Sequence, residues 1–392
     1  ASAESAYELS IKHFLYTHFR DPRSFFHPEV VKRLGEFLKL LVTPLWTFSG
    51  KFVKDERLKK MLNFPAVFLG ASPYNTPAMY HLMTHVDMNQ GVFYPQGGFY
   101  TLIESVARLA KEHGAEIHTS SPVTKILTEN GKAVGVQVGA AEYHADVVVA
   151  SADLHFVETK LLERKDQSFP QSWWDKRVPG PSALLMYLGV KGKIDQLDHH
   201  TLLYTKDWGK NFAKVFRKAD GKSEVPDPAS LYICNPSKTD PSVAPEGMEN
   251  IFVLVPAAAD VGIGGSGDES FEQAADKVID QIATWCEIPD LKERIVVRRT
   301  MGPRDFQSEL NAWNGTALGM AHTLRQSAFF RPKNYSKKLK NLFYVGHNTI
   351  PGIGLPMCLI GAELVYKHLT DDRSAGPISG ELKPVKVWKG LA

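Results

Sequence analysis

The segment from Asn341 to Leu369, with the sequence NLFYVGHNTIPGIGLPMCLIGAELVYKHL, constrains the fold of this chain more than any other stretch. It combines a β-rich run at 342–345, a loop rich in glycine and proline, and an apolar run at 359–369 with helical spacing. This order predicts a strand, a tight loop and a helix. The glycines and prolines of the loop are Gly346, Pro351, Gly352, Gly354 and Pro356.

Such a loop suits the close approach of a ligand. Glycine has no Cβ atom, so a ligand can lie directly against its backbone. The helix expected after Pro356 presents unpaired N–H groups and the positive end of its dipole. These features favour a corner that binds an anionic or electron-rich cofactor over an ordinary connection between a strand and a helix.

The same segment resembles the C-terminal flavin-binding signature of the carotenoid (phytoene) desaturase family, within the FAD-dependent amine-oxidase-like proteins. That family ends with an apolar strand, a glycine, a Pro-Gly-x-Gly-x-Pro loop and a helix. His347, Asn348 and Ile350 depart from the family pattern, so no role of a family histidine is carried over. Further motifs follow in the family's order at 94–98 (YPQGG), 114–138, 141–154, 231–256 and 324–334.

The resemblance implies an α/β fold with α+β elements, in which an incomplete Rossmann-like FAD-binding domain joins a sheet-and-helix substrate domain. It divides the chain into 1–94 (helical, substrate- or membrane-facing), 95–160 (FAD-domain segment with a β insertion), 161–300 (substrate domain), 301–370 (C-terminal FAD-domain segment) and 371–392 (loose tail). The residues expected to contact FAD are Gly346, Gly352, Gly354, Pro356, Gly97, Gly98 and Val123.

Hydrophobic patterning predicts the remaining elements. Alternating Val134, Val136 and Val138 after Asn130-Gly131 indicate a β-hairpin with strands from Val123 onward. Further strands are expected at 183–190, 231–234, 251–255 and 294–299, and helices at 102–110 and 269–285.

The family also opens with a strand and a Gly-x-Gly-x-x-Gly turn that holds the FAD pyrophosphate. This chain opens with ASAESAYELSIKHFLYTHF and has no glycine before Gly35. We therefore expect a chain that lacks the N-terminal flavin-binding segment, and in which FAD is absent or incompletely held.

One literal match to the glycine fingerprint occurs at Gly262, Gly264 and Gly267. The first of these glycines should directly follow a strand, but residues 256–261 intervene. A surface loop before a helix capped near Asp268 or Ser270 is the favoured interpretation. A nicotinamide-dependent enzyme that uses these glycines is the alternative.

The leading functional hypothesis is desaturation of a phytoene-like polyene by hydride transfer to flavin. A flavin-dependent carotene isomerase and a polyene- or membrane-binding module without redox activity remain alternatives. No catalytic residue is assigned, although Glu309 and Asp305 in RDFQSELNAWNG are the carboxylates to test first as proton acceptors.

Composition and spacing exclude several other functions. The net charge of +3 argues against a dedicated nucleic-acid binder. Cys234, Cys286 and Cys358 are odd in number and far apart, so a reducing compartment is expected and neither a disulfide framework nor a zinc site. His81 and His85 are expected to pack in the core, and His199 and His200 lack a recognisable ligand spacing.

An apolar and basic stretch at 28–64 allows two interpretations. Its apolar residues recur at near-helical spacing and Pro44 should end or kink the first helix. The stretch is either a core-facing helix with a solvated basic face or an amphipathic element on an anionic membrane. Because a carotenoid substrate is stored in membranes, we expect a cytoplasmic protein peripheral to the membrane. No apolar run reaches the roughly 20 residues needed to span a bilayer.

Overall fold

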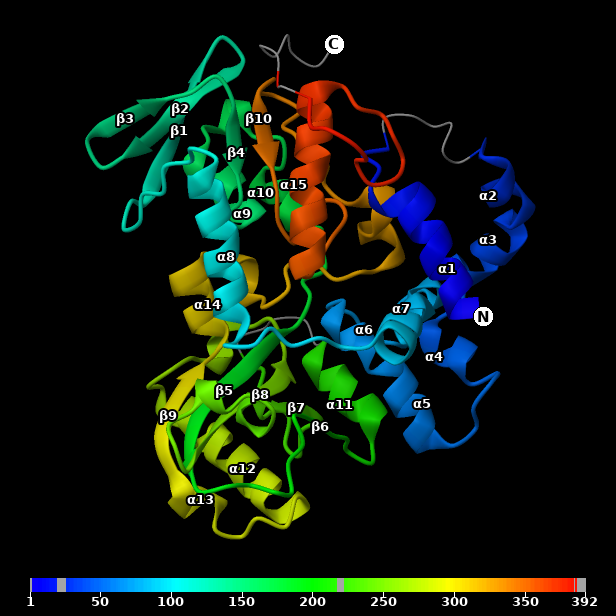
Figure 1. Cartoon of the computed structure of the whole chain (residues 1–392), viewed down its shortest axis with the longest axis vertical. Coiled ribbons are helices and arrows are strands. Elements are labelled where there is room, and N and C mark those ends of the chain that lie inside the picture. Colours follow the sequence, from blue (N-terminus) through cyan, green and yellow to red (C-terminus); the bar gives the residue numbers. More distant parts are fainter. Residues whose placement is uncertain (1, 20–25, 217–221, 384, 386–392) are drawn as a thin grey trace.

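The computed structural model describes residues 2–19, 26–216, 222–383 and 385. It mixes helices and sheets, as predicted (Figure 1). The α-helices are α1 (Ser2–Ser10), α2 (Pro28–Lys32), α3 (Leu34–Val42), α4 (Leu45–Ser49), α5 (Glu56–Asn63), α6 (Pro65–Phe68), α7 (Leu82–His85), α8 (Phe99–Glu112), α9 (Leu154–Phe156), α10 (Gln171–Trp174), α11 (Trp208–Val215), α12 (Glu269–Trp285), α13 (Leu291–Arg294), α14 (Pro303–Leu310) and α15 (Leu355–Thr370). The strands are β1 (Val123–Glu129), β2 (Lys132–Val138), β3 (Ala141–His144), β4 (Val148–Ala150), β5 (Ser182–Lys191), β6 (His200–Leu203), β7 (Leu231–Cys234), β8 (Met248–Ala257), β9 (Ile295–Met301) and β10 (Leu342–Tyr344).

A five-stranded antiparallel sheet with the order β6-β7-β8-β5-β9 forms the lower part of the molecule. Its long central pair, β5 and β8, runs in register from Ser182 opposite Ala257 to Lys191 opposite Met248. Successive side chains of a strand point to opposite faces. One face is therefore mostly apolar, and its residues include Leu184, Met186, Leu188, Val190, Ile251, Val253 and Val255.

Helix α12 closes this apolar face. Its buried residues recur at helical spacing and form one stripe along the helix: Phe271, Ala275, Val278, Ile279 and Ile282. The stripe packs on the sheet in the largest hydrophobic cluster of the described chain. The predicted helix at 269–285 and the four predicted strands of this region are thus confirmed.

The opposite face of the sheet is only partly covered. Phe306 of α14 packs on Leu185 at one end, whereas Tyr187 is 40% exposed. Tyr187 lies 5.4 Å from Phe252 between ring centroids. We call this face, with Leu185, Tyr187, Tyr232, Phe252 and Leu254, the open face of the sheet.

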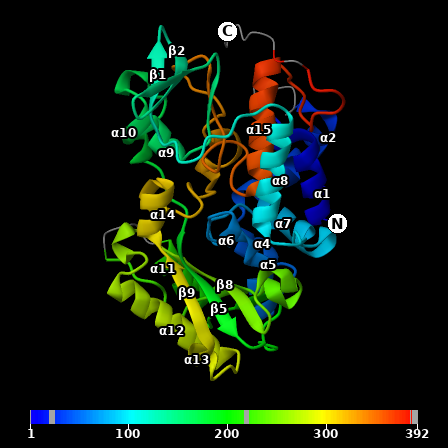
Figure 2. The same cartoon turned by 60° about the vertical axis from the view of Figure 1, so that its left-hand side comes forward.

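The upper part holds the hairpin β1–β2 with β3, and a parallel pair formed by β4 and β10 (Figures 1 and 2). Asn130 and Gly131 both have positive φ at the hairpin turn, as the Asn-Gly prediction requires. Asn341 joins the two sheets, because its buried amide bonds to both backbone groups of Ala133 and to the carbonyl of Asp146. A second core, with Trp174, Trp313, Leu342 and Tyr344 among its members, lies between them.

Helix α8 differs from the other long helices. None of its side chains is buried in the described part of the chain. The predicted apolar residues Ile103, Val106 and Leu109 are each about half exposed. Helix α8 runs in the same direction as α15, so both helices begin toward the lower sheet (Figure 1).

Two sequence expectations need correction. The first helix expected from Val30 is broken at Arg33 between α2 and α3, whereas its end before Pro44, the N-cap of α4, is as expected. The tail was expected to be loose, yet its described part folds back on α15. Tyr366 donates to the carbonyl of Lys383 and Glu363 accepts from the N–H of Ile378; the tail residues 384 and 386–392 lie outside the described residues.

Glu158 provides a pH-dependent test of the second core. Burial raises the pKa of this carboxyl above its ordinary value of 4.5, although it accepts hydrogen bonds from the Tyr344 hydroxyl and the Phe169 N–H. The native state therefore holds this proton more tightly than the unfolded state. As the pH rises from about 4.5 through the raised pKa, the free energy of unfolding should fall.

Urea unfolding at several pH values checks this expectation. The glutamine of the Glu158→Gln variant cannot ionise, so the free energy of unfolding of this variant should fall less with increasing pH than that of the wild type. The exposed Glu309 gives the control Glu309→Gln, which should follow the wild-type pH dependence. Parallel curves for the wild type and Glu158→Gln would contradict the assignment.

Candidate functional site

The glycine-proline loop lies at the carboxyl edge of the parallel pair. Because β4 and β10 are parallel, the residues that follow both strands meet at the same edge. A small hollow of about 10 Å³ lies there, lined by 151–154 and 344–349. Ligands of α/β proteins bind outside the carboxyl ends of parallel strands, so this edge is the candidate site.

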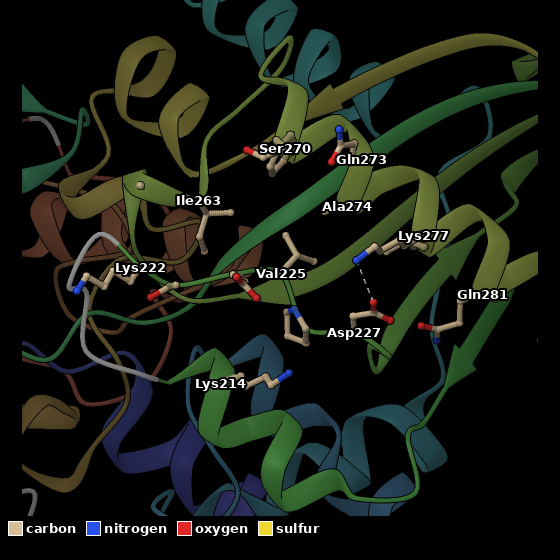
Figure 3. Close-up of a pocket in the computed structure, with 16 residues that line it drawn as sticks. Lys214, Lys222, Val225, Asp227, Ile263, Ser270, Gln273, Ala274, Lys277 and Gln281 are labelled. Atoms are coloured by element: carbon tan, nitrogen blue, oxygen red, sulfur yellow. Dashed lines mark ion pairs between the residues drawn. The ribbon is translucent and has the colours of Figure 1, made fainter.

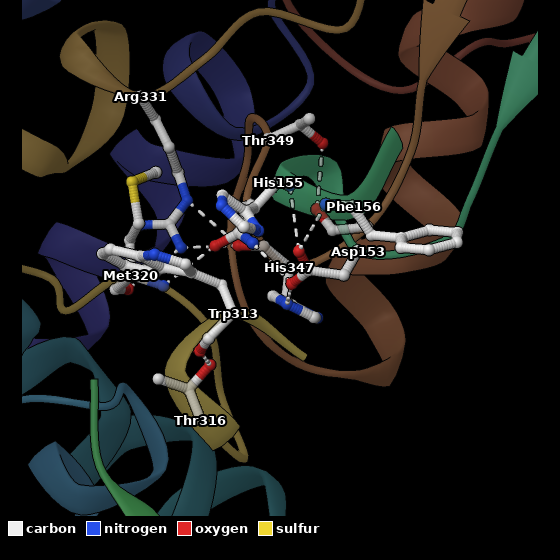
Figure 4. A network of polar contacts seen from close by, with 11 residues as sticks. Asp153, His155, Phe156, Trp313, Thr316, Met320, Arg331, His347 and Thr349 are labelled. Atoms are coloured by element: carbon white, nitrogen blue, oxygen red, sulfur yellow. Dashed lines mark hydrogen bonds and ion pairs between the residues drawn. The ribbon is translucent and has the colours of Figure 1, made fainter. Parts of the chain in front are cut away.

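Asp153 connects the two loops (Figure 4). Its carboxylate caps α9 by accepting from the backbone N–H groups of His155 and Phe156. The second oxygen lies 3.3 Å from His347 Nε2 and 3.1 Å from Asn348 Nδ2. The Asp153 side chain is 2% exposed and that of His347 is 33% exposed. The network therefore fixes the loop after β10 and leaves His347 facing the hollow.

Arg331 supplies a buried positive charge beside this network. Its guanidinium donates to the backbone carbonyls of His347, Gln326 and Met320. Burial lowers the pKa of Arg331 to about 10, so the group stays protonated at neutral pH. A fixed cation next to the loop favours negative charge at the site.

His322 explains one of the predicted glycines. A Cβ atom added at Gly352 would lie 2.6 Å from His322 Nε2. His322 is buried, its Nδ1 lies 2.7 Å from the carbonyl oxygen of Leu69, and burial lowers its pKa well below the usual value. Close packing against this imidazole alone requires a glycine at position 352, so its cofactor role stays a prediction.

Gly346, Gly354 and Pro356 keep the features expected of a ligand corner. Gly346 has a φ of +133°, and the nearest atom to an added Cβ would be the carbonyl oxygen of Ser151 at 3.7 Å. Gly354 is the N-cap of α15 and has no side-chain capping bond. Gly354 and Pro356 are exposed. The first N–H groups of this 16-residue helix are therefore available to an anion.

The other predicted cofactor residues make no direct contact with this corner in the described part of the chain. Gly97 and Gly98 begin α8, and the N–H of Gly97 already donates to Asp240 Oδ2 at 2.6 Å. Val123 begins β1 and packs against the second core. Their contact with a cofactor remains a prediction.

The two carboxylates singled out as proton acceptors lie away from the corner. Asp305 Oδ2 accepts from the backbone N–H groups of Gly302 and Ser266, so it is a capping residue of α14. Glu309 is exposed and lies 3.9 Å from Arg299. Neither residue contacts the network around Asp153.

The glycine run at 262–267 does not form a phosphate-binding turn. The backbone N–H groups of Gly265, Ser266 and Gly267 donate to Asp268, Asp305 and Glu272 respectively. Three carboxylates thus occupy the amides that a phosphate would need and would repel it. Asp268 is the N-cap of α12 as expected, but its side chain binds Gly265 and Arg304 instead of capping the helix.

A larger hollow of about 680 Å³ lies between α11 and α12 (Figure 3). Its wall carries the ion pair between Lys277 and Asp227, with a nitrogen-to-oxygen distance of 3.4 Å. It is on the lower part of the molecule, away from the corner. We assign it no function.

Comparisons with known proteins identify the family. The model of the flavin-containing amine oxidoreductases matches residues 32–364. A carotenoid 3,4-desaturase of Haloarcula japonica is 37% identical over 372 residues, which are 95% of this chain and 73% of that protein. The chain belongs to the carotenoid desaturases of the flavin-containing amine oxidoreductase family. The zeta-carotene-forming phytoene desaturase of Myxococcus xanthus is 32% identical, covering 94% of this chain and 70% of its own length.

Solved structures agree with this desaturase family at the level of the fold. An oxidoreductase from Methanosarcina mazei superposes with a TM-score of 0.53 at 17% identity, covering 89% of this chain and 75% of its own. Putrescine oxidase bound to putrescine gives a TM-score of 0.50 at 13% identity, covering 93% of this chain and 71% of its own. Such low identities show a shared fold and nothing finer.

The corner of this desaturase-family chain fits a flavin in its chemistry. The uncapped N-terminus of α15, the open backbone at Gly346 and the buried cation of Arg331 all favour an anionic, planar group. Sequence analysis singled out Gly346 and Gly354 as cofactor contacts, and this role stays a prediction. It missed Asp153, although an aspartate directly before a helix is an ordinary capping signal, and it assigned no role to Asn348 or Arg331.

The clash between Gly352 and His322 can be measured. Gly352→Ala should destabilise the protein by about 1–3 kcal/mol, because the buried imidazole must move. Gly354→Ala is the matched control, since φ at Gly354 is also positive, at +115°, but only Pro356 and Met357 of the same helix turn lie within 4 Å of the added Cβ.

Denaturant unfolding of both variants, in the wild-type and His322→Ala backgrounds, separates two contributions to the loss of stability. One is the backbone strain at positive φ, and the other is the steric clash between the added Cβ and the His322 imidazole. The extra cost of Gly352→Ala over Gly354→Ala should shrink once His322 is removed. Equal costs in both backgrounds would show that the imidazole does not set this position.

Proposed function

We propose that the protein is an FAD-dependent desaturase that acts on a carotenoid precursor, a phytoene-like polyene. The observation that carries this proposal is the 37% identity to the Haloarcula carotenoid 3,4-desaturase across 95% of the chain. The Myxococcus relative and a 1-hydroxycarotenoid 3,4-desaturase of Flavobacterium also bear desaturase names. The chemistry of the glycine corner supports the same reaction class.

The corner residues would hold the flavin and stabilise its charge. A bound flavin supplies the hydride acceptor that amino-acid side chains cannot provide. Gly346 lets a planar ring lie against the backbone, and the N-terminus of α15 and Arg331 favour negative charge there. Asp153 holds the loop through His347 and Asn348, so the binding surface is preorganised.

The open face of the five-stranded sheet would receive the polyene. Tyr187 and Phe252 lie opposite each other across β5 and β8, and Leu254 pairs with Tyr232 across β8 and β7. The row presents apolar and aromatic surface that is incompletely buried within the chain. An extended hydrocarbon gains about 25 cal/mol for each Å² of apolar surface removed from water.

Spectroscopy and product analysis test the activity. Expressed from its full coding sequence and purified with FAD, the protein should show flavin absorbance and, with a phytoene-like polyene in liposomes and an electron acceptor, should form products with more conjugated double bonds. Gly346→Val should lose flavin binding and activity by tenfold or more, because its side chain enters the space beside Ser151.

The control is Gly139→Val in the turn between β2 and β3. Gly139 also has a positive φ, at +58°, but no neighbour within 4 Å of the added Cβ, so this variant strains the backbone and should still retain flavin. Products of unchanged mass and altered geometry, formed without an acceptor, would instead indicate an isomerase. Absence of both flavin and product would contradict the proposal.

We further propose that the N-terminal helices contact the surface of an anionic membrane on the cytoplasmic side. Among the described residues, no helix is both long and apolar enough to cross a bilayer. Helices α2 to α6 and the segment between α4 and α5 instead leave large apolar side chains exposed, in a stretch rich in lysine and arginine. The exposed apolar residues are Val31, Leu34, Leu38, Val42, Phe52, Leu58, Met61 and Phe68.

Vesicle flotation tests this contact. The double variant Leu38→Glu/Phe52→Glu should lower the affinity for vesicles with anionic lipid on the order of a hundredfold. Two exposed apolar side chains that would insert between the lipid headgroups and acyl chains are replaced by carboxylates. Val297→Glu, at a position on β9 that is 60% exposed, should bind like the wild type. Equal binding of all three proteins would refute the proposed surface.

A further inference from the structure

Two residues with metal-binding side chains lie opposite each other at one end of the open face. In the β6–β7 ladder, His200 is the direct partner of Cys234. Cys234 is in turn the partner of Phe252 in β8, which pairs with Tyr187 in β5. Directly opposed residues have Cβ atoms about 4.5–5.5 Å apart, so the imidazole and the thiol emerge side by side at the edge of the open face.

His199 joins them although it is the sequence neighbour of His200. Consecutive residues of a strand point to opposite faces, but His199 lies just before β6 and its ring turns toward the same side. The centroids of the two imidazoles are 4.4 Å apart, and the carbonyl of His199 accepts from the N–H of Asn235 at 2.9 Å. One ring nitrogen from each histidine and the Cys234 sulfur consequently lie within 4.8 Å of one another.

Hydroxyl groups hold both imidazoles by Nδ1. His199 Nδ1 lies 2.6 Å from Thr239 Oγ1, and that hydroxyl can donate to the carbonyl of Pro236 while it accepts from the ring. His200 Nδ1 lies 2.7 Å from the Tyr232 hydroxyl. Metal-binding histidines usually have their second nitrogen fixed in this way.

The remaining nitrogen of His199 has no partner. His199 Nε2 is a buried atom that makes no hydrogen bond to any part of the described chain. A buried polar atom without a partner costs about 1–3 kcal/mol. A bond from this nitrogen to a ligand would remove that cost.

We propose that His199, His200 and Cys234 bind one Zn²⁺ ion. Two imidazole nitrogens and a thiolate form a borderline-soft donor set, which suits zinc. Zinc bond lengths of about 2.0–2.3 Å place tetrahedral ligands roughly 3.5 Å apart, so the side chains need to close by about 1 Å. Cys234 releases its thiol proton to solvent as the zinc–sulfur bond forms. Because His200 is exposed, water can take the fourth position.

The ion would stabilise the edge of the open face. It would join the edge strand β6 to β7, next to Tyr94, whose ring centroid is 4.8 Å from that of His199. Tyr94 precedes the Gly97 amide that Asp240 binds, on the loop that enters α8. The site is independent of the flavin corner, and its ligands are too far apart in the sequence to form a spacing motif.

Cobalt and zinc titrations of the full chain test the proposal. After chelator treatment, the wild type should bind one Co²⁺ with an intense near-ultraviolet band from thiolate-to-cobalt charge transfer. Isothermal titration should give one Zn²⁺ per chain, and Zn²⁺ should raise the melting temperature. Cys234→Ser should abolish the band, and His199→Ala should weaken zinc binding at least about tenfold.

Cys286→Ser is the matched control, because Cys286 is likewise a partly buried free cysteine but follows α12. This variant should keep the band, the stoichiometry and the thermal shift. The wild-type spectrum needs no variant to fold, so absence of a thiolate band overturns the site directly. A band that persists in Cys234→Ser, or that is lost in Cys286→Ser, would also overturn it.

Discussion

The parallel pairing of β4 with β10 determines where the parts of the upper region lie. It brings the loop after Ala150 beside the loop after Tyr344, although the two are far apart in the chain. Asp153 then joins these loops by binding His347 and Asn348. The first residues of α15 follow directly, so the exposed start of that helix is positioned by the same pair of strands. Without this pairing the two loops that form the glycine corner would not be held next to each other.

The two faces of the lower sheet are covered to different extents. Alternation along β5, β7 and β8 gives a mostly apolar face that α12 covers and an opposite face that stays partly open. The open face holds both the aromatic row proposed for the polyene and, at its edge, the proposed zinc ligands. Substrate binding and the stability of the sheet edge would therefore be linked through neighbouring residues such as Phe252 and Cys234.

Local patterns predicted most of the regular structure because their signals lie within a few residues. The Asn130-Gly131 turn, the stripe of α12 and the alternation of β5 are examples. The contacts between distant segments could not be predicted in this way. Asp153 and His347 are 194 positions apart, and His199 and Cys234 converge only because β6 pairs with β7.

Gly352 shows a further limit of sequence reasoning. Its place in a glycine-rich loop indicated contact with a ligand, but the structure shows that a buried imidazole already requires a glycine there. A glycine pattern reports that the backbone is approached closely. It does not say whether the approaching group is a cofactor or a side chain of the same chain.

Lys367 connects the segment that follows α1 to the C-terminal end of α15. Its buried ammonium group donates to the carbonyls of Tyr16, near α1, and of Ser374 and Gly376, beyond the end of α15. Three bonds to one cation are costly to break in a buried setting. The segment that follows α1 and the helix that starts at the glycine corner are therefore anchored to each other, so a movement of one would carry the other with it.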